Sequence, residues 1–516
     1  MKKISLSIIT ISVAAAVMLA ACSKKVTGAT DNISALNPTN EDANAGTWKT
    51  VLLTRPDTFA VAAPAATSAA SYTAEINEIK GAQASLTDEQ RAIIKYWSAG
   101  SVLRWNEILR DLVAKHNLPP YQNEDGSYPI PTAANPFNYP QYPFSNPPYA
   151  ARAYAYVSAA QYDALVAAWH YKALYNRTAP YNVDSTIVAM VPKNTLPSYP
   201  SEDAVLAGAM ATMMTMLFPT EIAYVQQKLE DEENYRIWSG ANVRSDITAG
   251  EALGRQVASV FVARGKADNV SKAVGTPAQW AQFVTTAQAN GTTPWYSLET
   301  PARNPMLPFF GNVLPFLFDS TTVVSLRPGP PPADNSDERK TELAEEKAYI
   351  TNATREQMSI IQFWADGANT YTPPGHWNAI AADDFIGQNF SEVRWARNMA
   401  LINMSLMDVA IVCWNTKYYY FDPRPTQLDP SIKTLTGVPN FPSYISGHAC
   451  FSSAAATILG HIIPAKAAAY TAMAQQASDS RMYSGIHFRI DCETGLQVGQ
   501  SVGAYAVKRA QTDGAE

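Results

Sequence analysis

The chain has 516 residues, of which 47% are hydrophobic and 16% are charged, so it holds enough apolar material for a large globular core. Its formal net charge is -6 and it has no basic tract, which argues against a protein that binds nucleic acid. Outside the N-terminal segment only Cys413, Cys450 and Cys492 remain, a number and spacing that exclude a disulfide framework and a cysteine-based metal site. We expect these three to be small buried side chains.

The first 22 residues have the pattern of a targeting segment. Lys2 and Lys3 precede an apolar run over residues 4–20, and small residues then lead directly to Cys22. The arrangement resembles a bacterial lipoprotein signal; a plain secretory signal and an uncleaved helix are the alternatives. The resemblance implies a signal peptide over 1–21, a lipid on Cys22 and a flexible tether over 22–48. It implies a protein exported to the cell envelope and anchored by its lipid to the periplasmic or surface side of a bacterial membrane.

The rest of the chain has the pattern of a helical protein. Apolar residues recur at spacings of three and four through long Ala-, Met-, Leu- and Gln-rich stretches, and alternating runs typical of strands are scarce. Proline-rich loops interrupt the pattern at 119–149, 192–200, 301–316 and 327–334. No stretch after the targeting segment has the roughly 18 uninterrupted apolar residues of a membrane-spanning helix. The sequence therefore predicts an all-α fold.

The chain also repeats itself. A capping-box sequence, Thr-x-x-Gln, begins at Thr87 and again at Thr354, and an aromatic-Trp pair follows each at the same distance. Further along, a set of residues recurs 245 positions later without a gap: Asp163, Trp169, Lys172, Tyr175, Pro180, Pro197, Ser198, Tyr199, Ser201, Ala204, Arg236, Ser239, Gly240, Arg244 and Asp246. We interpret this as a duplication of one helical bundle. The expected domains are an N-terminal bundle over 49–326, a proline-rich connection over 327–340 and a C-terminal bundle over 341–516.

The two copies differ at the residues that can do chemistry. Four such residues of the second copy, Arg424, Gly447, His448 and His487, correspond to Ala179, Glu202, Asp203 and Asn242 in the first. Asp366 likewise corresponds to Ala99 when the capping boxes are aligned. The sequence therefore predicts that only the C-terminal bundle has an intact site and that the N-terminal site is degenerate.

The second-copy residues suit a tetrahedral oxyanion. Lys417, Arg424 and Arg481 offer positive charges, and Ser446-Gly447 offers a hydroxyl and a closely approachable backbone N–H. His448 and His487 supply acid–base and nucleophile or ligand functions near neutral pH. On a helix, Asp491 lies on the same face as His487, so it can accept a hydrogen bond from one ring nitrogen and leave the other free.

Three ordered motifs carry a family resemblance. They are Lys417-x6-Arg424-Pro425, then Pro-Ser-x-x-Ser446-Gly447-His448, then Ser480-Arg481-x5-His487-x3-Asp491. Together they resemble the signature shared by type 2 phosphatidic acid phosphatases, bacterial acid phosphatases and vanadium-dependent haloperoxidases. Looser similarity to the haloperoxidase branch runs from about residue 84 to the end, through 326–332 (LRPGPPP), 364–367 (WADG) and 372–377 (TPPGHW).

The resemblance implies roles for individual residues. His487 would bind the vanadium, and Lys417, Arg424, Arg481, Ser446 and the Gly447 N–H would hold the vanadate oxygens. His448 would be the acid–base group, with Asp491 supporting His487. Asp366 would be the ion partner that orients Arg481, and Lys417 would polarise bound hydrogen peroxide. His376 either lines the pocket or only closes a turn.

The favoured function is a vanadium-dependent haloperoxidase that oxidises bromide or chloride with hydrogen peroxide and delivers hypohalous acid to a small organic acceptor. Phe441, seven residues before His448, resembles chloroperoxidase-type members, whereas Ile445 stands where the family usually has Pro. The alternative is an exported acid phosphatase in which His487 accepts the phosphoryl group and His448 protonates the leaving group. A third reading is an oxyanion-binding lipoprotein without turnover. The sequence leaves the oligomeric state open, although helical surfaces of this kind often pair as homodimers.

Overall fold

The computed structural model describes residues 33–118, 146–300 and 302–516. The predicted signal peptide over 1–21, the lipid-bearing Cys22, the start of the tether and residues 119–145 of the first proline-rich loop lie outside these ranges. The described residues are helical, as predicted, and form no strand beyond one isolated bridge between Thr178 and Pro197.

The helices fall into two sets that follow each other along the chain. The first set comprises η2 (Ala45–Thr47), α2 (Ala70–Gln83), α3 (Asp88–Trp97), α4 (Ser101–His116), α5 (Pro147–Tyr175), α6 (Pro180–Val183), α7 (Glu202–Leu217), α8 (Ile222–Trp238) and α9 (Arg244–Ala267). A connecting stretch carries η3 (Val270–Lys272), α10 (Pro277–Ala289), η4 (Phe310–Asn312) and α11 (Ser320–Ser325). The second set comprises α12 (Asp337–Thr351), α13 (Arg355–Phe363), α14 (Thr372–Ile386), α15 (Glu392–Tyr420), α16 (Pro425–Leu428), α17 (Gly447–Ile462), η5 (Pro464–Lys466), α18 (Ala467–Tyr483) and α19 (Arg489–Ala510).

Local sequence signals begin several of these helices. Both predicted capping boxes are confirmed: the Thr87 side chain accepts from the Gln90 backbone N–H while Gln90 accepts from that of Thr87, and Thr354 and Gln357 do the same. These reciprocal bonds satisfy backbone donors that the first turn leaves unpaired, and so fix where α3 and α13 begin.

The 245-residue offset of the sequence repeat recurs in the helix boundaries. Helices α5 and α15 each have 29 residues, and both end in a left-handed residue, Asn176 and Phe421. The bounds of α6, α7 and α8 return at the same offset in α16, α17 and α18, and α9 and α19 begin at Arg244 and Arg489.

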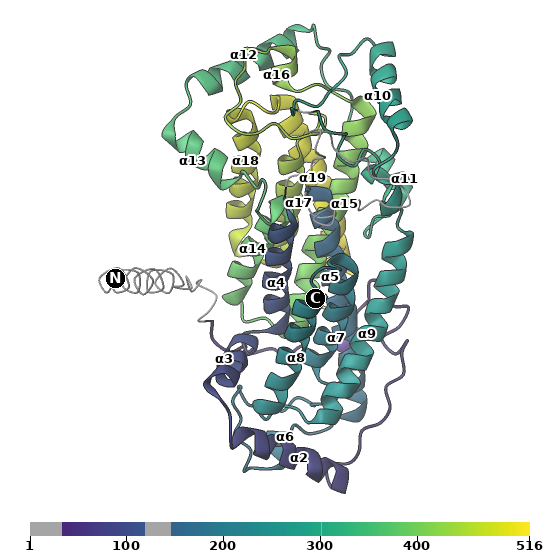
Figure 1. The fold of residues 1–516 in the computed structure, drawn as a ribbon, viewed down its shortest axis with the longest axis vertical. Helices are drawn as coiled ribbons and strands as arrows, with labels where there is room; N and C mark the ends of the chain where they lie inside the picture. The colour runs from purple at the N-terminus through teal and green to yellow at the C-terminus, as the bar shows by residue number, and fades with distance from the viewer. Residues whose placement is uncertain (1–32, 119–145, 301) are drawn as a thin grey trace, which may run out of the picture.

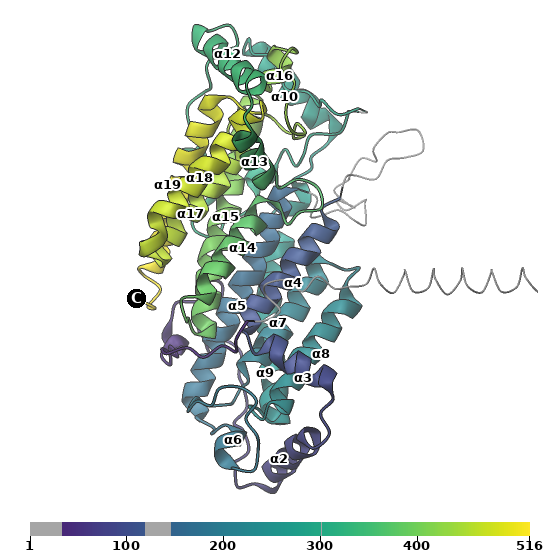
Figure 2. The same cartoon turned by 90° about the vertical axis from the view of Figure 1, so that its left-hand side faces the viewer.

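The two long helices α5 and α15 lie side by side along the middle of the molecule, with the rest of the first set towards one end and that of the second towards the other (Figures 1 and 2). One hydrophobic core runs through both sets, from Trp105 and Tyr154 to Met407 and Phe451. The stretch Glu392–Leu428 is long and apolar enough to cross a membrane by length and composition, but 94% of its most apolar window is buried inside this core. Cys413, Cys450 and Cys492 are free and buried, as expected.

Glycines allow the closest helix pairs to form. Gly254 of α9 lies against the carbonyl of Val205 in α7, and Gly499 of α19 lies against the carbonyl of Cys450 in α17. A side chain at either glycine would overlap the facing backbone, which cannot move without parting the two helices. The N-terminus of α17 carries three residues of the predicted site, Ser446, Gly447 and His448. The contact between α17 and α19 therefore also fixes the position of these residues.

We therefore expect Gly499→Ala to lower the free energy of unfolding by about 1–3 kcal/mol, the range for an overpacked core, as measured by chemical denaturation. The control is Gly81→Ala in α2, where an added methyl group meets nothing within 4 Å and raises helix propensity. Equal effects of the two substitutions would show that the α17–α19 contact is not tight.

Candidate oxyanion site

A cavity of about 700 Å³ opens where the second helix set meets the loop after α13. Six of the predicted site residues line it: Asp366, Phe441, Gly447, His448, Arg481 and His487. The other four, Lys417, Arg424, Ser446 and Asp491, are fully buried immediately behind its wall. The ten residues come from four chain segments. These are the loop after α13, the end of α15 with the start of α16, the N-terminus of α17 with the loop before it, and the stretch from the end of α18 to the start of α19.

The N-terminus of α17 forms one wall of the cavity. Ser446 is its N-cap, with the side chain accepting from the Ala449 N–H at 3.4 Å and the backbone N–H donating to the Asp491 carbonyl at 2.9 Å. Gly447 lines the cavity, and a Cβ built on it would make only ordinary van der Waals contact with two aromatic rings at 3.9 Å. Unpaired N–H groups and the helix dipole make such an end attractive to an anion.

His487 is held in one orientation by Asp491. The His487 Nδ1 lies 2.9 Å from Asp491 Oδ2, which also accepts from Ser443 Oγ at 2.5 Å and from the Phe488 N–H at 3.2 Å. Since Asp491 takes the Nδ1–H, the lone pair is on Nε2, where Arg424 Nη1 approaches to 3.0 Å. Burial, followed by the charges of Arg424 and Lys417, lowers the pKa of His487 well below its usual value, so the ring is neutral and able to act as ligand or nucleophile.

Three buried cations surround this histidine, and none of them has a carboxylate within ion-pair distance among the described residues. Lys417 Nζ donates to the carbonyls of Pro442 and Ser443, both at 2.8 Å. Arg424 donates to the Phe441 and Ile486 carbonyls, and Arg481 Nη2 donates to the Trp364 carbonyl at 2.8 Å. All three are at most 2% exposed.

Burial dominates the electrostatics of these cations. It lowers the pKa of Lys417 to about 8 and those of Arg424 and Arg481 to about 10. Elsewhere the protein pairs its buried arginines with acids, as in Arg397 with Asp513. Uncompensated buried charge is costly, so three such cations around one cavity indicate that a multiply charged anion completes the site.

Asp366 lies between two histidines. Its Oδ1 is 3.0 Å from His376 Nδ1, and its Oδ2 is 3.6 Å from His448 Nε2. Burial opposes the charge of this carboxylate, but the contacts from His376 and His448 outweigh it and lower the pKa of Asp366 to about 2. The expected ion pair between Asp366 and Arg481 is not among the contacts of the described chain. The left-handed backbone at Asp366 (φ 46°) turns its side chain to the histidines, while the Trp364 carbonyl accepts from Arg481.

His448 is a neutral imidazole in this setting. Burial, then the charge of Arg481, lowers its pKa to about 4 in spite of the opposing effect of Asp366. Its Nε2 faces Asp366, so Nδ1 is the nitrogen left for the cavity that His448 lines.

Phe441 forms the apolar part of the wall. Its ring packs on Trp414 with centroids 5.0 Å apart and lies 4.9 Å from Lys417 Nζ and 5.1 Å from Arg424 Cζ. It therefore shields both cations from water, which strengthens their pull on an anion.

Sequence reasoning missed Ser443 and left His376 undecided. Ser443 stands in the Pro-Ser-Tyr segment that both copies share, with Ser198 as its counterpart. A residue that is identical in the two copies does not stand out when the functional residues are sought among the differences between them. In the structure both serines contact the aspartate of their own half, Asp491 and Asp246. His376 does not line the cavity but contacts Asp366, which does.

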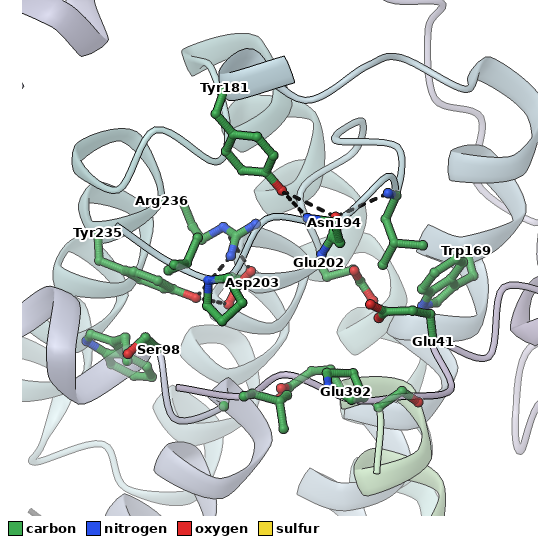
Figure 3. A pocket seen from close by; sticks show the side chains of 18 residues that line it. Glu41, Ser98, Trp169, Tyr181, Asn194, Glu202, Asp203, Tyr235, Arg236 and Glu392 are labelled. Carbon is green, nitrogen blue, oxygen red and sulfur yellow. Dashed lines mark hydrogen bonds and ion pairs between the residues drawn. The ribbon is translucent and has the colours of Figure 1, made fainter. Parts of the chain in front are cut away.

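The corresponding place in the first half is filled by the protein's own carboxylates (Figure 3). Lys172 pairs with Glu202 at 3.1 Å, and Arg236 pairs with Asp203 at 3.1 Å. These two acids stand at the positions of Gly447 and His448. The cavity beside them measures only about 100 Å³.

Comparisons with known proteins agree with this geometry. Residues 398–514 match the PAP2 superfamily, whereas no curated protein sequence matches the chain. Among solved structures, a bacterial vanadium-dependent iodoperoxidase is similar with a TM-score of 0.55 at 24% identity, over 70% of this chain and 91% of that one. A holo-type bacterial vanadium-dependent chloroperoxidase is similar with a TM-score of 0.50 at 13% identity, over 74% and 96%. At these identities the likeness shows a shared fold.

Inorganic phosphate is a probe for this site, and we expect its affinity to depend on Lys417. The free lysine loses its proton as pH rises through about 8, whereas the bound anion favours the charged form. Above that pH, binding must take up a proton, so the affinity measured by calorimetry should fall by up to tenfold per pH unit.

The matched variants are Lys417→Met and Lys172→Met. Loss of Lys417 should weaken binding about tenfold or more and remove the pH dependence above 8, because a charged hydrogen bond is lost. Lys172 already pairs with Glu202, so its loss should leave phosphate binding unchanged. The site assignment fails if the two variants bind phosphate alike.

Proposed function

Because residues 398–514 form a PAP2 superfamily domain, we propose that the chain is a vanadium-dependent haloperoxidase, which oxidises bromide or chloride with hydrogen peroxide to hypohalous acid. The observation that carries the proposal is the group of three buried cations without carboxylate partners around a neutral His487. A small organic acceptor then takes the oxidised halogen. The iodoperoxidase and chloroperoxidase folds support the general class, and the halide is part of the proposal.

The residues present fit vanadate. Vanadate is a tetrahedral oxyanion, which matches three convergent cations, and the cavity that Gly447 lines lets an oxygen approach the N-terminus of α17. His487 Nε2 would bind the vanadium, while Lys417, Arg424, Arg481, Ser446 and the Gly447 N–H would hold the oxygens. When bound, vanadate supplies a Lewis-acidic centre that activates hydrogen peroxide for two-electron oxidation of a halide.

The protein's own residues handle the protons and the charge. His448 takes a proton from hydrogen peroxide at Nδ1 and returns one when the peroxide bond breaks, so that peroxide, halide and one proton yield hypohalous acid and water. Lys417 withdraws electron density from the oxygen that the halide attacks. Asp491 holds the Nδ1–H of His487 and so keeps the lone pair on Nε2, where a ligand would take the place of the Arg424 contact. Phe441 and Trp414 keep water away from the reacting oxygen.

A duplication accounts for the single site. The shared helix bounds and the retained Ser198 and Ser443 support two halves of common origin. In the first half, Glu202 and Asp203 neutralise Lys172 and Arg236, so an external anion gains nothing by entering. The first half then serves as a scaffold whose long helix α5 supports α15.

A phosphatase is the second candidate, since the PAP2 match covers phosphatases and the same cations suit a phosphate ester. Vanadate resembles the transition state of phosphoryl transfer, so one site can be complementary to both. In that case His487 Nε2 attacks phosphorus to give a phosphohistidine, and His448 passes to the leaving oxygen a proton that its Nδ1 takes up from the bound monoester monoanion. Water later cleaves the phosphorus–nitrogen bond.

Halogenation by the processed protein distinguishes the two. With hydrogen peroxide and bromide, we expect turnover only after loading with orthovanadate, and its loss by at least a hundredfold in His487→Ala because the metal ligand is gone. Chloride and iodide are run in parallel to fix the halide. The matched control is Asn242→Ala, at the position of His487 in the first half, which should keep most of the activity.

Hydrolysis of a phosphate ester is the activity that would support the second candidate. Vanadate-inhibited hydrolysis of a phosphate monoester without any halogenation would assign the chain to the phosphatase branch. Oxyanion binding with neither activity would leave a binding lipoprotein.

The location in the cell envelope is a separate proposal that follows from Cys22. We expect the protein to fractionate with membranes and to become soluble after Cys22→Ser, because a diacyl anchor supplies the only strong membrane affinity that the sequence indicates. Labelling with a radioactive fatty acid checks this directly. Membrane association that persists in the variant would point to an uncleaved helix instead.

A further inference from the structure

His376 lies outside the cavity wall but is fixed in contact with it. It is 8% exposed in α14, and its ring packs on Trp364 with centroids 4.7 Å apart and on Phe363 at 4.9 Å. Tyr371 closes a third side at 6.2 Å. Packed between these aromatic rings, the imidazole of His376 lies with Nδ1 3.0 Å from Asp366 Oδ1.

Asp366 is held in an unusual conformation. Its φ of 46° is in the left-handed region, which is unfavourable for a residue with a side chain and persists only where the surroundings fix it. Its Oδ1 accepts from His376, whereas Oδ2 has no hydrogen bond among the described residues. His448 Nε2 lies 3.6 Å from Oδ2, and that nitrogen has no hydrogen bond among the described residues either.

Asp366 Oδ2 and His448 Nε2, the two atoms without a hydrogen bond, are complementary as acceptor and donor. A carboxylate oxygen accepts only, so His448 must present Nε2–H to it, and the neutral ring then carries its lone pair on Nδ1, the nitrogen left for the cavity. A small approach, from 3.6 Å to hydrogen-bond distance, completes the contact. His376 fixes the other oxygen of the same carboxylate and thereby decides where Oδ2 points.

This arrangement occurs only in the half that has the oxyanion site. At the offset that aligns the two capping boxes, Asp366 corresponds to Ala99 and His376 to Leu109, and at the offset of the helix repeat His448 corresponds to Asp203. All three polar residues of the series are therefore absent together from the first half. A merely structural histidine would have no reason to follow the acid–base group.

We propose that His376 is a positioning residue for His448: through Asp366 it selects the tautomer of His448 that has Nε2 protonated and Nδ1 free to exchange a proton with bound substrate. The inference rests on the proposed role of His448 in acid–base chemistry, which the haloperoxidase and the phosphatase share. It assigns a role to the histidine of the PPGHW segment, in which Pro373 lines the cavity and His376 does not.

The test uses the whole protein after the predicted signal peptide, with ¹⁵N-labelled histidine. The imidazole ¹⁵N shifts of His448, identified by comparison with His448→Asn, report its tautomer without any turnover. We expect the Nε2–H form in the wild type and a mixture of both forms in His376→Leu. His376→Asn, which places an amide N–H near the position of Nδ1, should restore the wild-type pattern. A wild-type His448 protonated on Nδ1 overturns the proposal, whether or not His376→Leu folds.

Kinetics and binding supply the second readout. With orthovanadate loaded, His376→Leu should lower kcat about tenfold to a hundredfold, as loss of an orienting partner does, while vanadate affinity by equilibrium dialysis stays within about threefold. His376→Asn should recover most of kcat. The matched control is His461→Leu, which removes a histidine–carboxylate contact of 2.8 Å with Glu516 and should change neither quantity.

The outcomes separate the two hypotheses. A parallel loss of vanadate affinity and kcat in His376→Leu, or unchanged ¹⁵N shifts, refutes the positioning role. If the protein shows no halogenation but the tautomer shifts as expected, the haloperoxidase assignment fails while the role of His376 stands, and the kcat comparison is made on phosphate ester hydrolysis.

Discussion

Three positive charges buried without carboxylates are the constraint on which the rest of the site depends. Lys417, Arg424 and Arg481 are held by backbone carbonyls, one hydroxyl and the neutral ring of His487, which orient them but do not neutralise them. Such a cluster is unfavourable in an empty protein and becomes favourable when an anion enters. The packing of α15, α17 and α19 must therefore be strong enough to keep the cluster in place, and the glycine contact between α17 and α19 is part of that rigidity.

The two halves show how little is needed to close or open such a site. Both keep a lysine on the long helix, a serine at the N-cap of α7 or α17 and an aspartate in the first turn of α9 or α19. In the first half, Glu202 and Asp203 supply the negative charges that neutralise the cations. In the second, glycine and histidine at these positions leave the cations unpaired and the space open. The two halves thus differ in whether carboxylates of the chain itself pair with these cations.

His448 belongs to a longer series of polar contacts than the motifs indicate. His448 faces Asp366, and Asp366 faces His376, which is packed among aromatic rings. Burial keeps His448 neutral, with its pKa lowered to about 4, so its tautomer rather than its charge decides which atom can exchange a proton. A rigid series of this kind suits a group that must act on an oxygen held only a few ångströms away.

The sequence by itself determined the all-α class, the starts of α3 and α13, the repeat and the group of residues that the fold brings together at one cavity. It could do so because helical periodicity, capping boxes and cation spacing are local or nearly local patterns. The partners of Asp366, the role of Ser443 and the position of His376 were decided only by tertiary structure. Asp366 and Arg481 lie 115 residues apart in the chain, and whether a side chain faces a guanidinium or an imidazole depends on one left-handed backbone residue and on the packing of α14. Spacing along the sequence carries no information on such a direction, because it is fixed by contacts between segments that meet only in the folded protein.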